Sequence, residues 1–349
     1  MIKLFKALAA GLYAAGVFLR NLMYDVGLLR SMCHRVPVVC VGNITVGGTG
    51  KTPTVEFLVE SLLALGHRPA VLSRGYGRRT KGYLEVTCDQ PFINTGDEPM
   101  QIKMKFPTIP VVVCEDRNMG VERIMREHPQ TDIVIMDDGF QHRSIRPTVN
   151  IVLLDFTRPV SSDHFLPLGA LRDERRQLRR ADIFIVTKTP GELSAEQKAA
   201  VAESISLRDN QQMYFTTMSY GALRPLFAED VMAWDEEDGA AVVFSGIANP
   251  LPFEKGVGEQ CKVLESVSFA DHHVYTVGDM KRVLKVRSSY KAEKPIVVTT
   301  EKDAVKLSGN RRVPEELRGV LYVLPMRLDF VGGDGRELIK DIYNVIEAD

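Results

Sequence analysis

The chain has 349 residues, of which 45% are hydrophobic and 26% are charged, so it is long enough for two globular domains with separate cores. Its 44 basic and 45 acidic residues leave a formal net charge of −1, which argues against recruitment of nucleic acid by an overall positive field. The five cysteines are scattered without a C-x-x-C spacing. This usage favours reduced thiols over a disulfide framework or a zinc site.

The first 30 residues predict an amphipathic helix on a membrane surface. The uncharged run at 7–19 is shorter than the roughly 20 residues that usually span a bilayer. One helical face carries apolar residues: Leu4, Leu8, Leu12, Ala15, Leu19 and Leu22. The opposite face carries Lys6, Tyr13 and Arg20, whose basic members suit lipid phosphates. The alternatives are a helix packed on the following domain and a secretory signal peptide.

Strands and helices alternate after this segment, which predicts a doubly wound parallel α/β sheet covered on both faces. The expected strands are 37–41, 69–72, 109–113, 132–136, 150–154 and 182–186, and the expected helices include 52–65 and 119–127. A second, smaller α/β series follows residue 216, with strands at 241–244, 262–268, 295–300 and 320–323 and helices at 277–288 and 335–346. The segment 214–228 has no strong helical period and is expected to link the two halves.

A glycine-rich loop, VGNITVGGTGKTP at 41–53, follows the first expected strand. Its Gly50-Lys51-Thr52 end matches a P-loop, where backbone N–H groups cradle phosphate, lysine reaches the β and γ oxygens, and threonine binds Mg²⁺. The full pattern has glycine where this chain has Thr45, and the alternative is a glycine turn that happens to precede GKT. We assign ATP binding to the whole loop: Thr45, Val46, Gly47, Gly48, Thr49, Gly50, Lys51 and Thr52.

An apolar run at 133–136 ends in Asp137 and Asp138. A P-loop enzyme commonly receives the acidic ligand that completes its Mg²⁺ shell from the end of such a strand. A simple turn also favours Asp-Asp-Gly, and it is the P-loop that makes the metal interpretation preferable. We therefore predict that Thr52, Asp137 and Asp138 bind Mg²⁺, with Glu98 as a further candidate ligand.

Seven blocks of sequence, in order, resemble the tetraacyldisaccharide 4′-kinase family, the lipid A 4′-kinases of Gram-negative bacteria. They are VGNITVGGTGKTP (41–53), GDEP (96–99), DDGFQHR (137–143), LPLGALRDE (166–174), SGIANP (245–250), FADHH (269–273) and TTEKDAVKL (299–307). The resemblance implies transfer of the ATP γ-phosphate to the 4′-hydroxyl of a lipid A disaccharide 1-phosphate. It places the chain at the cytoplasmic face of the inner membrane, as a peripheral protein or with a single N-terminal anchor, and no protein partner is expected.

The resemblance also directs attention to candidate catalytic residues. Asp97 of GDEP is our candidate base for the acceptor hydroxyl, although Gly-Asp-Glu-Pro is also an ordinary helix start. A histidine can orient such a carboxylate; His272 and His273 are chemically equivalent candidates, and the family pattern favours His272. Lys51 and Arg117 complete the predicted catalytic set, the latter because the resemblance places it near the active cleft.

On the substrate side we assign Gln141, His142, Arg172 and Asp173. This chain reads Leu-Arg-Asp-Glu where the family usually has an LREP-like sequence, so either Asp173 or Glu174 could fill the family's acidic position. The arginines that follow are spaced to line roughly one side of a helix: Arg172, Arg175, Arg176, Arg179 and Arg180. That side could meet the substrate's 1-phosphate or lipid headgroups, or be only a solvated face.

The expected organisation is therefore a membrane-associated helix (1–30), a P-loop NTPase-type kinase domain (31–215) and a C-terminal α/β domain (216–349) that closes the active-site cleft. Two other P-loop functions are alternatives. A membrane-associated ATPase of the partitioning or assembly type has a signature lysine where this chain has Val46. A GTPase reads its base with [NT]KxD, and the comparable TKTP at 187–190 ends in proline.

Overall fold

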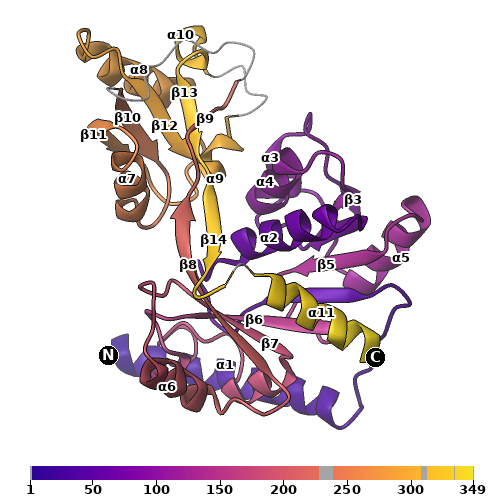
Figure 1. Ribbon diagram of the computed structural model, residues 1–349. Coiled ribbons are helices and arrows are strands. Elements are labelled where there is room, and N and C mark those ends of the chain that lie inside the picture. Colours follow the sequence, from indigo (N-terminus) through magenta and orange to yellow (C-terminus); the bar gives the residue numbers. More distant parts are fainter. Residues whose placement is uncertain (1, 228–238, 308–312, 334, 349) are drawn as a thin grey trace.

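The computed structural model describes residues 2–227, 239–307, 313–333 and 335–348, which form two lobes, each built on one β-sheet (Figure 1). The larger sheet has nine strands in the order β14-β8-β7-β6-β1-β5-β2-β4-β3. All its described pairs are parallel except β3–β4 and β14–β8 at the two edges. The chain leaves β1 towards β2 on one side and later reaches β6 on the other, so β1 marks the topological switch point, where doubly wound folds bind ligands.

The strands of the larger sheet are β1 (Val38–Gly42), β2 (Pro69–Ser73), β3 (Leu84–Glu85), β4 (Val111–Val113), β5 (Ile133–Asp137), β6 (Val149–Asp155), β7 (Ile183–Thr187), β8 (Gln212–Tyr220) and β14 (Met326–Phe330). The helical segments of the same lobe are α1 (Ile2–Asp25), α2 (Lys51–Ala64), α3 (Phe92–Thr95), α4 (Asp97–Lys105), α5 (Arg117–Glu127), η1 (Val160–Ser162), η2 (Arg175–Arg180), α6 (Ala195–Ile205) and α11 (Arg336–Ala348).

Helices cover both faces of this sheet, which explains why its strands are apolar along their length instead of alternating. Strands β1, β5 and β7 are buried at every position. On one face the core includes Val121 and Ile124 of α5. On the other face, side chains of α2, α4 and α11 pack together, among them Leu58, Ile102 and Ile342. Each fully buried side chain of this kind stabilises the fold by roughly 1.5–3 kcal/mol.

The smaller sheet has the order β11-β10-β12-β13-β9. Its strands are β9 (Arg224–Pro225), β10 (Ala240–Ser245), β11 (Lys262–Ser268), β12 (Ile296–Thr300) and β13 (Leu321–Leu324). Its helices are α7 (Leu251–Gly258), α8 (Val277–Ser289), α9 (Glu301–Ala304) and α10 (Glu315–Arg318). Each strand expected from the sequence has a counterpart whose ends lie within two residues of the expected ones, whereas β3, β8, β9 and β14 were not expected. The doubly wound fold class is confirmed.

The end of the chain departs from the expected domain boundary. We expected all of 216–349 to form the second domain, part of which lies outside the described residues. Strand β14 instead pairs antiparallel with β8 in the larger sheet, and α11 packs Leu338, Ile339 and Ile342 into the core of the larger lobe. The physical reason is the apolar stripe of α11, which is buried by the larger sheet. The segment 214–228, expected to be a plain linker, contributes much of β8.

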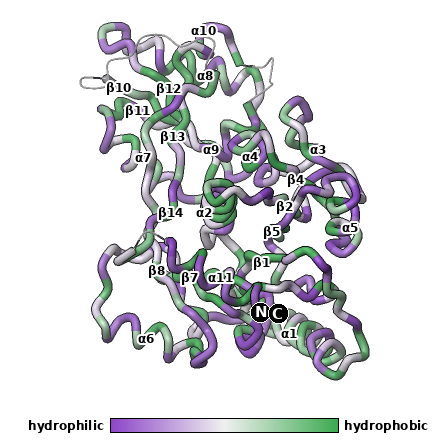
Figure 2. The backbone as a smooth tube through the Cα atoms, turned by 45° about the vertical axis from the view of Figure 1, so that its right-hand side comes forward, coloured by the Kyte–Doolittle hydropathy of each residue, from purple (hydrophilic) through white to green (hydrophobic). Residues whose placement is uncertain are grey.

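Helix α1 lies along the side of the larger lobe away from the smaller sheet (Figure 1), and Figure 2 shows the same placement from a second direction. Its apolar face is open: Leu4, Leu8 and Leu12 are each more than 60% exposed. Within the described chain, Leu4–Asp25 is long and apolar enough to cross a membrane by length and composition alone. Arg20, expected to face lipid phosphates, is exposed, and its Nη2 also donates to the carbonyl of Gln141 at 2.7 Å.

Candidate active site

The glycine-rich loop connects β1 to α2 at the switch point. Gly50 has a φ of 86° and precedes the first residue of α2, and this left-handed conformation suits glycine. No side chain of the described residues caps the helix, so its free N–H groups can meet an anion. The loop is held from within, since Asn43 Nδ2 donates to Thr49 Oγ1 at 2.7 Å.

The other residues of the loop lie against the segment that precedes η2. Thr45 forms a β-bridge with Leu171, and Val46 N donates to the carbonyl of Ala170 at 2.8 Å. Val46, Gly47 and Gly48 are exposed, and Gly47 has a φ of 107°. The loop therefore has a fixed base and an open rim, as a phosphate cradle requires.

The acidic pair ends β5, directly beside β1, where Val41 is in register with Asp137. Asp138 has a φ of 51°, a conformation that non-glycine residues seldom adopt and that clusters at functional sites. Its Oδ1 is 3.9 Å from Lys51 Nζ. Arg172 donates hydrogen bonds to both of its oxygens, with Nη1 to Oδ2 at 3.1 Å. Burial opposes the ionisation of Asp138, but the Arg172 hydrogen bonds and the Lys51 charge hold its pKa below the ordinary value.

Asp137 lies in a contrasting environment, because it is 5% exposed and its neighbour is also an anion. Burial, followed by the charge of Asp138, raises the pKa of Asp137 to about 6. Its Oδ2 accepts from Ser73 Oγ at 3.1 Å. Its Oδ1 is buried and receives no hydrogen bond from any residue that the structure describes. A buried carboxylate oxygen left in this way is suited to a cation.

The residues present fit a magnesium site of the P-loop kind. Thr52 lies in the first turn of α2, and Glu98 is close enough to Asp137 to contribute to its raised pKa. The described residues include no group of three or more His, Cys, Asp or Glu side chains with metal-ligand spacing. A P-loop site does not need one, because one hydroxyl, one or two carboxylates, water and the substrate phosphates complete the Mg²⁺ shell.

Asp97 and His272 meet across the two lobes. Asp97 begins α4 of the larger lobe, and His272 lies in the turn after β11 of the smaller one with a φ of 57°. His272 Nδ1 is 3.5 Å from Asp97 Oδ2. His273 instead pairs with Asp279 at 3.1 Å in the cap of α8. Of the two histidines that the sequence left open, His272 is the one beside Asp97.

A buried lysine contacts the same carboxylate. Lys306 Nζ is 3.9 Å from Asp97 Oδ2 and 3.1 Å from Asp303 Oδ1, and its side chain is 1% exposed. Asp303 is itself fixed by the backbone N–H of Gly246, which donates to its Oδ2 at 2.8 Å. The smaller lobe therefore presents both an imidazole and an ammonium group to Asp97.

Buried Arg117 and half-buried His142 lie in contact near the two aspartates. Arg117 is 2% exposed, and burial lowers its pKa against the opposing charges of Asp137 and Asp138. Its backbone N–H donates to His142 Nε2 at 3.5 Å. Burial and the Arg117 charge lower the pKa of His142 to about 4, so its imidazole is neutral at pH 7 and acts as a hydrogen-bonding group.

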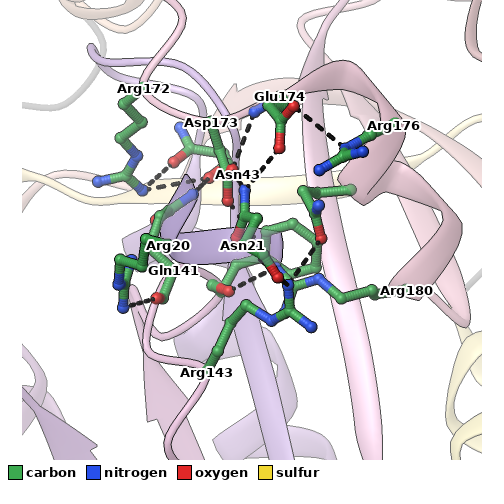
Figure 3. Close-up of polar contacts among 12 residues, drawn as sticks. Arg20, Asn21, Asn43, Gln141, Arg143, Arg172, Asp173, Glu174, Arg176 and Arg180 are labelled. Carbon is green, nitrogen blue, oxygen red and sulfur yellow. Dashed lines mark hydrogen bonds and ion pairs between the residues drawn. The ribbon is translucent and has the colours of Figure 1, made fainter. Parts of the chain in front are cut away.

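The other residues assigned to substrate lie around Asn43, at the base of the P-loop (Figure 3). Gln141 Nε2 donates to the carbonyl of Asn43 at 2.7 Å, and Arg172 Nη2 reaches the same carbonyl at 3.3 Å. Asp173 is 2% exposed and accepts from Asn21 Nδ2 at 2.8 Å. This placement disagrees with the assignment of Asp173 to substrate contact, because its buried carboxylate accepts a hydrogen bond from α1 instead.

The arginine run does not form the expected helical face. Residues 175–180 form the 3₁₀ segment η2, and Arg172 lies before it; a short 3₁₀ turn places every third residue in line. The side chains bind protein groups: Arg176 pairs with Glu174 at 3.1 Å, Arg179 with Asp25 at 2.7 Å, and Arg180 donates to a carbonyl at 2.8 Å. These arginines mainly fasten the loop to its neighbours.

Sequence reasoning missed four residues that shape the site, namely Asn21, Asn43, Ser73 and Lys306. Asn43 and Ser73 stand at the carboxyl ends of β1 and β2, which is the edge where doubly wound sheets bind ligands. Lys306 lies within the TTEKDAVKL block, so the resemblance could have drawn attention to it. Asn21 gave a weaker signal, as a single amide in an apolar helix.

A doubly wound sheet with a P-loop at its switch point and an acidic pair on the adjoining strand defines the class of P-loop nucleotide-binding α/β proteins. The family model described as tetraacyldisaccharide-1-P 4′-kinase matches residues 2–347. The chain belongs to this family.

Similar proteins extend over nearly the whole chain. A tetraacyldisaccharide 4′-kinase of Phocaeicola vulgatus is 39% identical over 334 residues, with 94% of this chain and 91% of the relative covered. A relative of the same name from Porphyromonas gingivalis is 36% identical, with 99% and 97% covered. The crystal structure of LpxK from Aquifex aeolicus in complex with ATP superposes with a TM-score of 0.75 at 28% identity and covers 99% of each chain.

Proposed function

We propose that this chain transfers the γ-phosphate of ATP to the 4′-hydroxyl of a tetraacyldisaccharide 1-phosphate, a lipid A precursor. The observation that carries the proposal is the pairing of Asp97 with His272 at 3.5 Å across the two lobes. Glu98, next to Asp97, lies near Asp137 at the P-loop. A base on one wall and its orienting group on the other suit a site that aligns a hydroxyl with a phosphate and excludes water.

The P-loop residues hold the nucleotide in this proposal. Lys51 neutralises the β and γ oxygens, and the backbone from Thr45 to Thr52 cradles the phosphates. Thr52, Asp137, Asp138 and Glu98 would hold Mg²⁺. When bound, Mg²⁺ neutralises charge on the phosphate oxygens.

The acceptor side of the reaction needs a base and a charge partner. Asp97 accepts the proton of the 4′-hydroxyl while the hydroxyl oxygen forms a bond to the γ-phosphorus. The bond between the γ-phosphorus and the bridging oxygen breaks, and that oxygen leaves with ADP. His272 orients the Asp97 carboxylate through Nδ1, and buried Arg117 adds positive charge near the aspartate pair. Phosphoryl transfer depends mainly on such positioning and charge stabilisation.

The lipid acceptor reaches the site from a membrane surface. The exposed apolar face of α1 supports placement of the enzyme on the bilayer, with the cytoplasmic face of the inner membrane as the side that supplies ATP. The candidate contacts for the sugar and its phosphate lie in the loops between α1 and the P-loop. They are Gln141, His142 and Arg172. Guanidinium groups suit the 1-phosphate.

A direct transfer assay tests this function. Purified full-length chain is incubated with γ-labelled ATP and detergent-dispersed tetraacyldisaccharide 1-phosphate, and the lipid is analysed for the position of the new phosphate. We expect label at the 4′ position. Hydrolysis of ATP without labelled lipid would reject the kinase and favour a membrane-associated ATPase, the alternative that the family match does not favour.

A further inference from the structure

One polar residue of α1 is buried, although the helix is otherwise largely open. Asn21 is 2% exposed, and its single amide nitrogen donates to Asp173 Oδ1 at 2.8 Å and to Glu174 Oε2 at 2.9 Å. Both N–H groups of the Asn21 amide therefore donate to carboxylates, and hydrogen bonds to charged acceptors are stronger than those to neutral ones. These two carboxylates directly follow Arg172 in the chain, so Asn21 fixes the segment that carries this arginine.

The opposite side of Asn21 binds the other active-site loop (Figure 3). Arg143 Nη1 donates to the backbone carbonyl of Asn21 at 3.1 Å and approaches its Oδ1 at 3.3 Å. Arg143 Nη2 also pairs with Asp25, one turn later in α1, at 2.8 Å. Because Arg143 belongs to the turn that begins at Asp138, Asn21 stands between two loops that converge on the P-loop.

Two further contacts of α1 reach the backbone of candidate substrate residues. Tyr13 Oη donates to the carbonyl of Arg172 at 3.1 Å, and Arg20 Nη2 donates to the carbonyl of Gln141 at 2.7 Å. The side chains of Arg172 and Gln141 then turn to Asn43, and Arg172 also grips Asp138. A continuous set of hydrogen bonds therefore runs from the membrane-facing helix to the acidic pair.

We propose that α1 is a positioning element of the active site, in which Asn21 holds the loops of Arg172 and Asp138 in register with the P-loop. A helix that served only to contact lipid would gain more from an apolar side chain here, since a buried amide is costly unless every group is satisfied. The inference rests on the proposed kinase function. It assigns separate tasks to the two sides of α1, with the apolar face holding lipid and the polar side holding the catalytic loops.

The test compares two substitutions in the full-length chain. Asn21→Leu keeps a side chain branched at Cγ and favours the helix, but it removes both donors to Asp173 and Glu174. Gly16→Ala is the matched control on the same helix, because a Cβ at Gly16 meets nothing within 4 Å. For each protein we would measure kcat, the KM values for ATP and for detergent-dispersed tetraacyldisaccharide 1-phosphate, and the fraction that sediments with vesicles of phosphatidylethanolamine and phosphatidylglycerol.

Asn21→Leu should lower kcat by about tenfold or more, the scale expected for lost hydrogen bonds to charged groups, and leave the vesicle-bound fraction unchanged. Gly16→Ala should match the wild type in every measurement. An unchanged kcat, or a loss of turnover that only follows a loss of vesicle binding, would overturn the inference.

A second variant covers the case in which Asn21→Leu unfolds. Tyr13→Phe removes one hydroxyl from a partly exposed site and should lower kcat severalfold at an unchanged melting temperature. Wild-type turnover in Tyr13→Phe, together with unfolding of Asn21→Leu, would also overturn the inference. A wild-type chain that transfers no phosphate would instead reject the proposed function, which the transfer assay reports separately.

Discussion

Asp137 is expected to destabilise the metal-free protein and yet to be required for turnover. Its carboxyl is buried beside another anion, its pKa is raised to about 6, and its Oδ1 has no hydrogen-bond donor among the described residues. The substitution Asp137→Asn removes the charge and retains an oxygen that can accept from Ser73 Oγ. We expect the variant to melt at a higher temperature than the wild type in EDTA and to lose transfer activity by orders of magnitude.

The raised pKa of Asp137 sets the size and the pH dependence of this effect. The buried site favours the protonated carboxyl. The stability that Asp137 contributes is therefore fully present below pH 3.8, where the carboxyl is protonated in both the folded and the unfolded chain, and it is lost as the pH rises through about 6. A difference between 3.8 and about 6 corresponds to at most about 3 kcal/mol above pH 6. The gain from Asp137→Asn should therefore be largest at pH 8 and about half as large at pH 5.

Differential scanning fluorimetry of both proteins at pH 8 and pH 5, in EDTA, measures this gain. A rise of at most about 6–12 °C at pH 8 is expected, because 1 kcal/mol corresponds to roughly 2–4 °C for domains of this size. Addition of Mg·ATP should stabilise the wild type more than the variant. An equal gain at both pH values, or a lower melting temperature at pH 8, would show that the buried charge does not limit stability.

Three further predictions concern other parts of the site and α1. Lys51→Ala should lower turnover by orders of magnitude and shrink the thermal stabilisation by Mg·ATP; near-wild-type transfer would exclude the loop as the phosphate site. Lys306→Met should lower kcat at least tenfold with a smaller change in the KM for ATP, because it removes the buried cation beside Asp97, and unchanged steady-state kinetics would contradict this role. Leu8→Ser with Leu12→Ser should release protein from phospholipid vesicles without reducing ATP-dependent stabilisation, whereas full sedimentation of the double variant would place the membrane contact elsewhere.

Most of the larger lobe was predictable because its signals are local. A parallel strand covered on both faces is continuously apolar, and β1, β5 and β7 have this pattern. The P-loop and the acidic pair were predictable for the same reason, since each is a short motif at the end of a strand. The meeting of Asp97 and His272 depended on the family resemblance, because no local pattern reports a contact between two lobes.

The features that the sequence did not predict are long-range contacts. The spacing of the arginine run fitted a helix, but ion pairs with Asp25 and Glu174 hold Arg179 and Arg176 on a 3₁₀ segment. The hydrogen bond from Arg20 of α1 to the Gln141 carbonyl was not predicted, because the two residues are more than 100 positions apart. The return of β14 to the first sheet has the same origin, since its pairing with β8 is visible only in the folded chain.

The central claim is that the two lobes act as one catalytic site, with Asp97 as the base and His272 as its orienting group. The most direct measurement is kcat for phosphate transfer by the wild type, Asp97→Ala, His272→Ala and the double variant. Each single substitution should lower kcat by a factor of about 10² to 10⁴, with smaller changes in the KM for ATP. The double variant should be little worse than the worse single variant, because groups that act as a unit are not additive. Losses that multiply in the double variant would contradict the account.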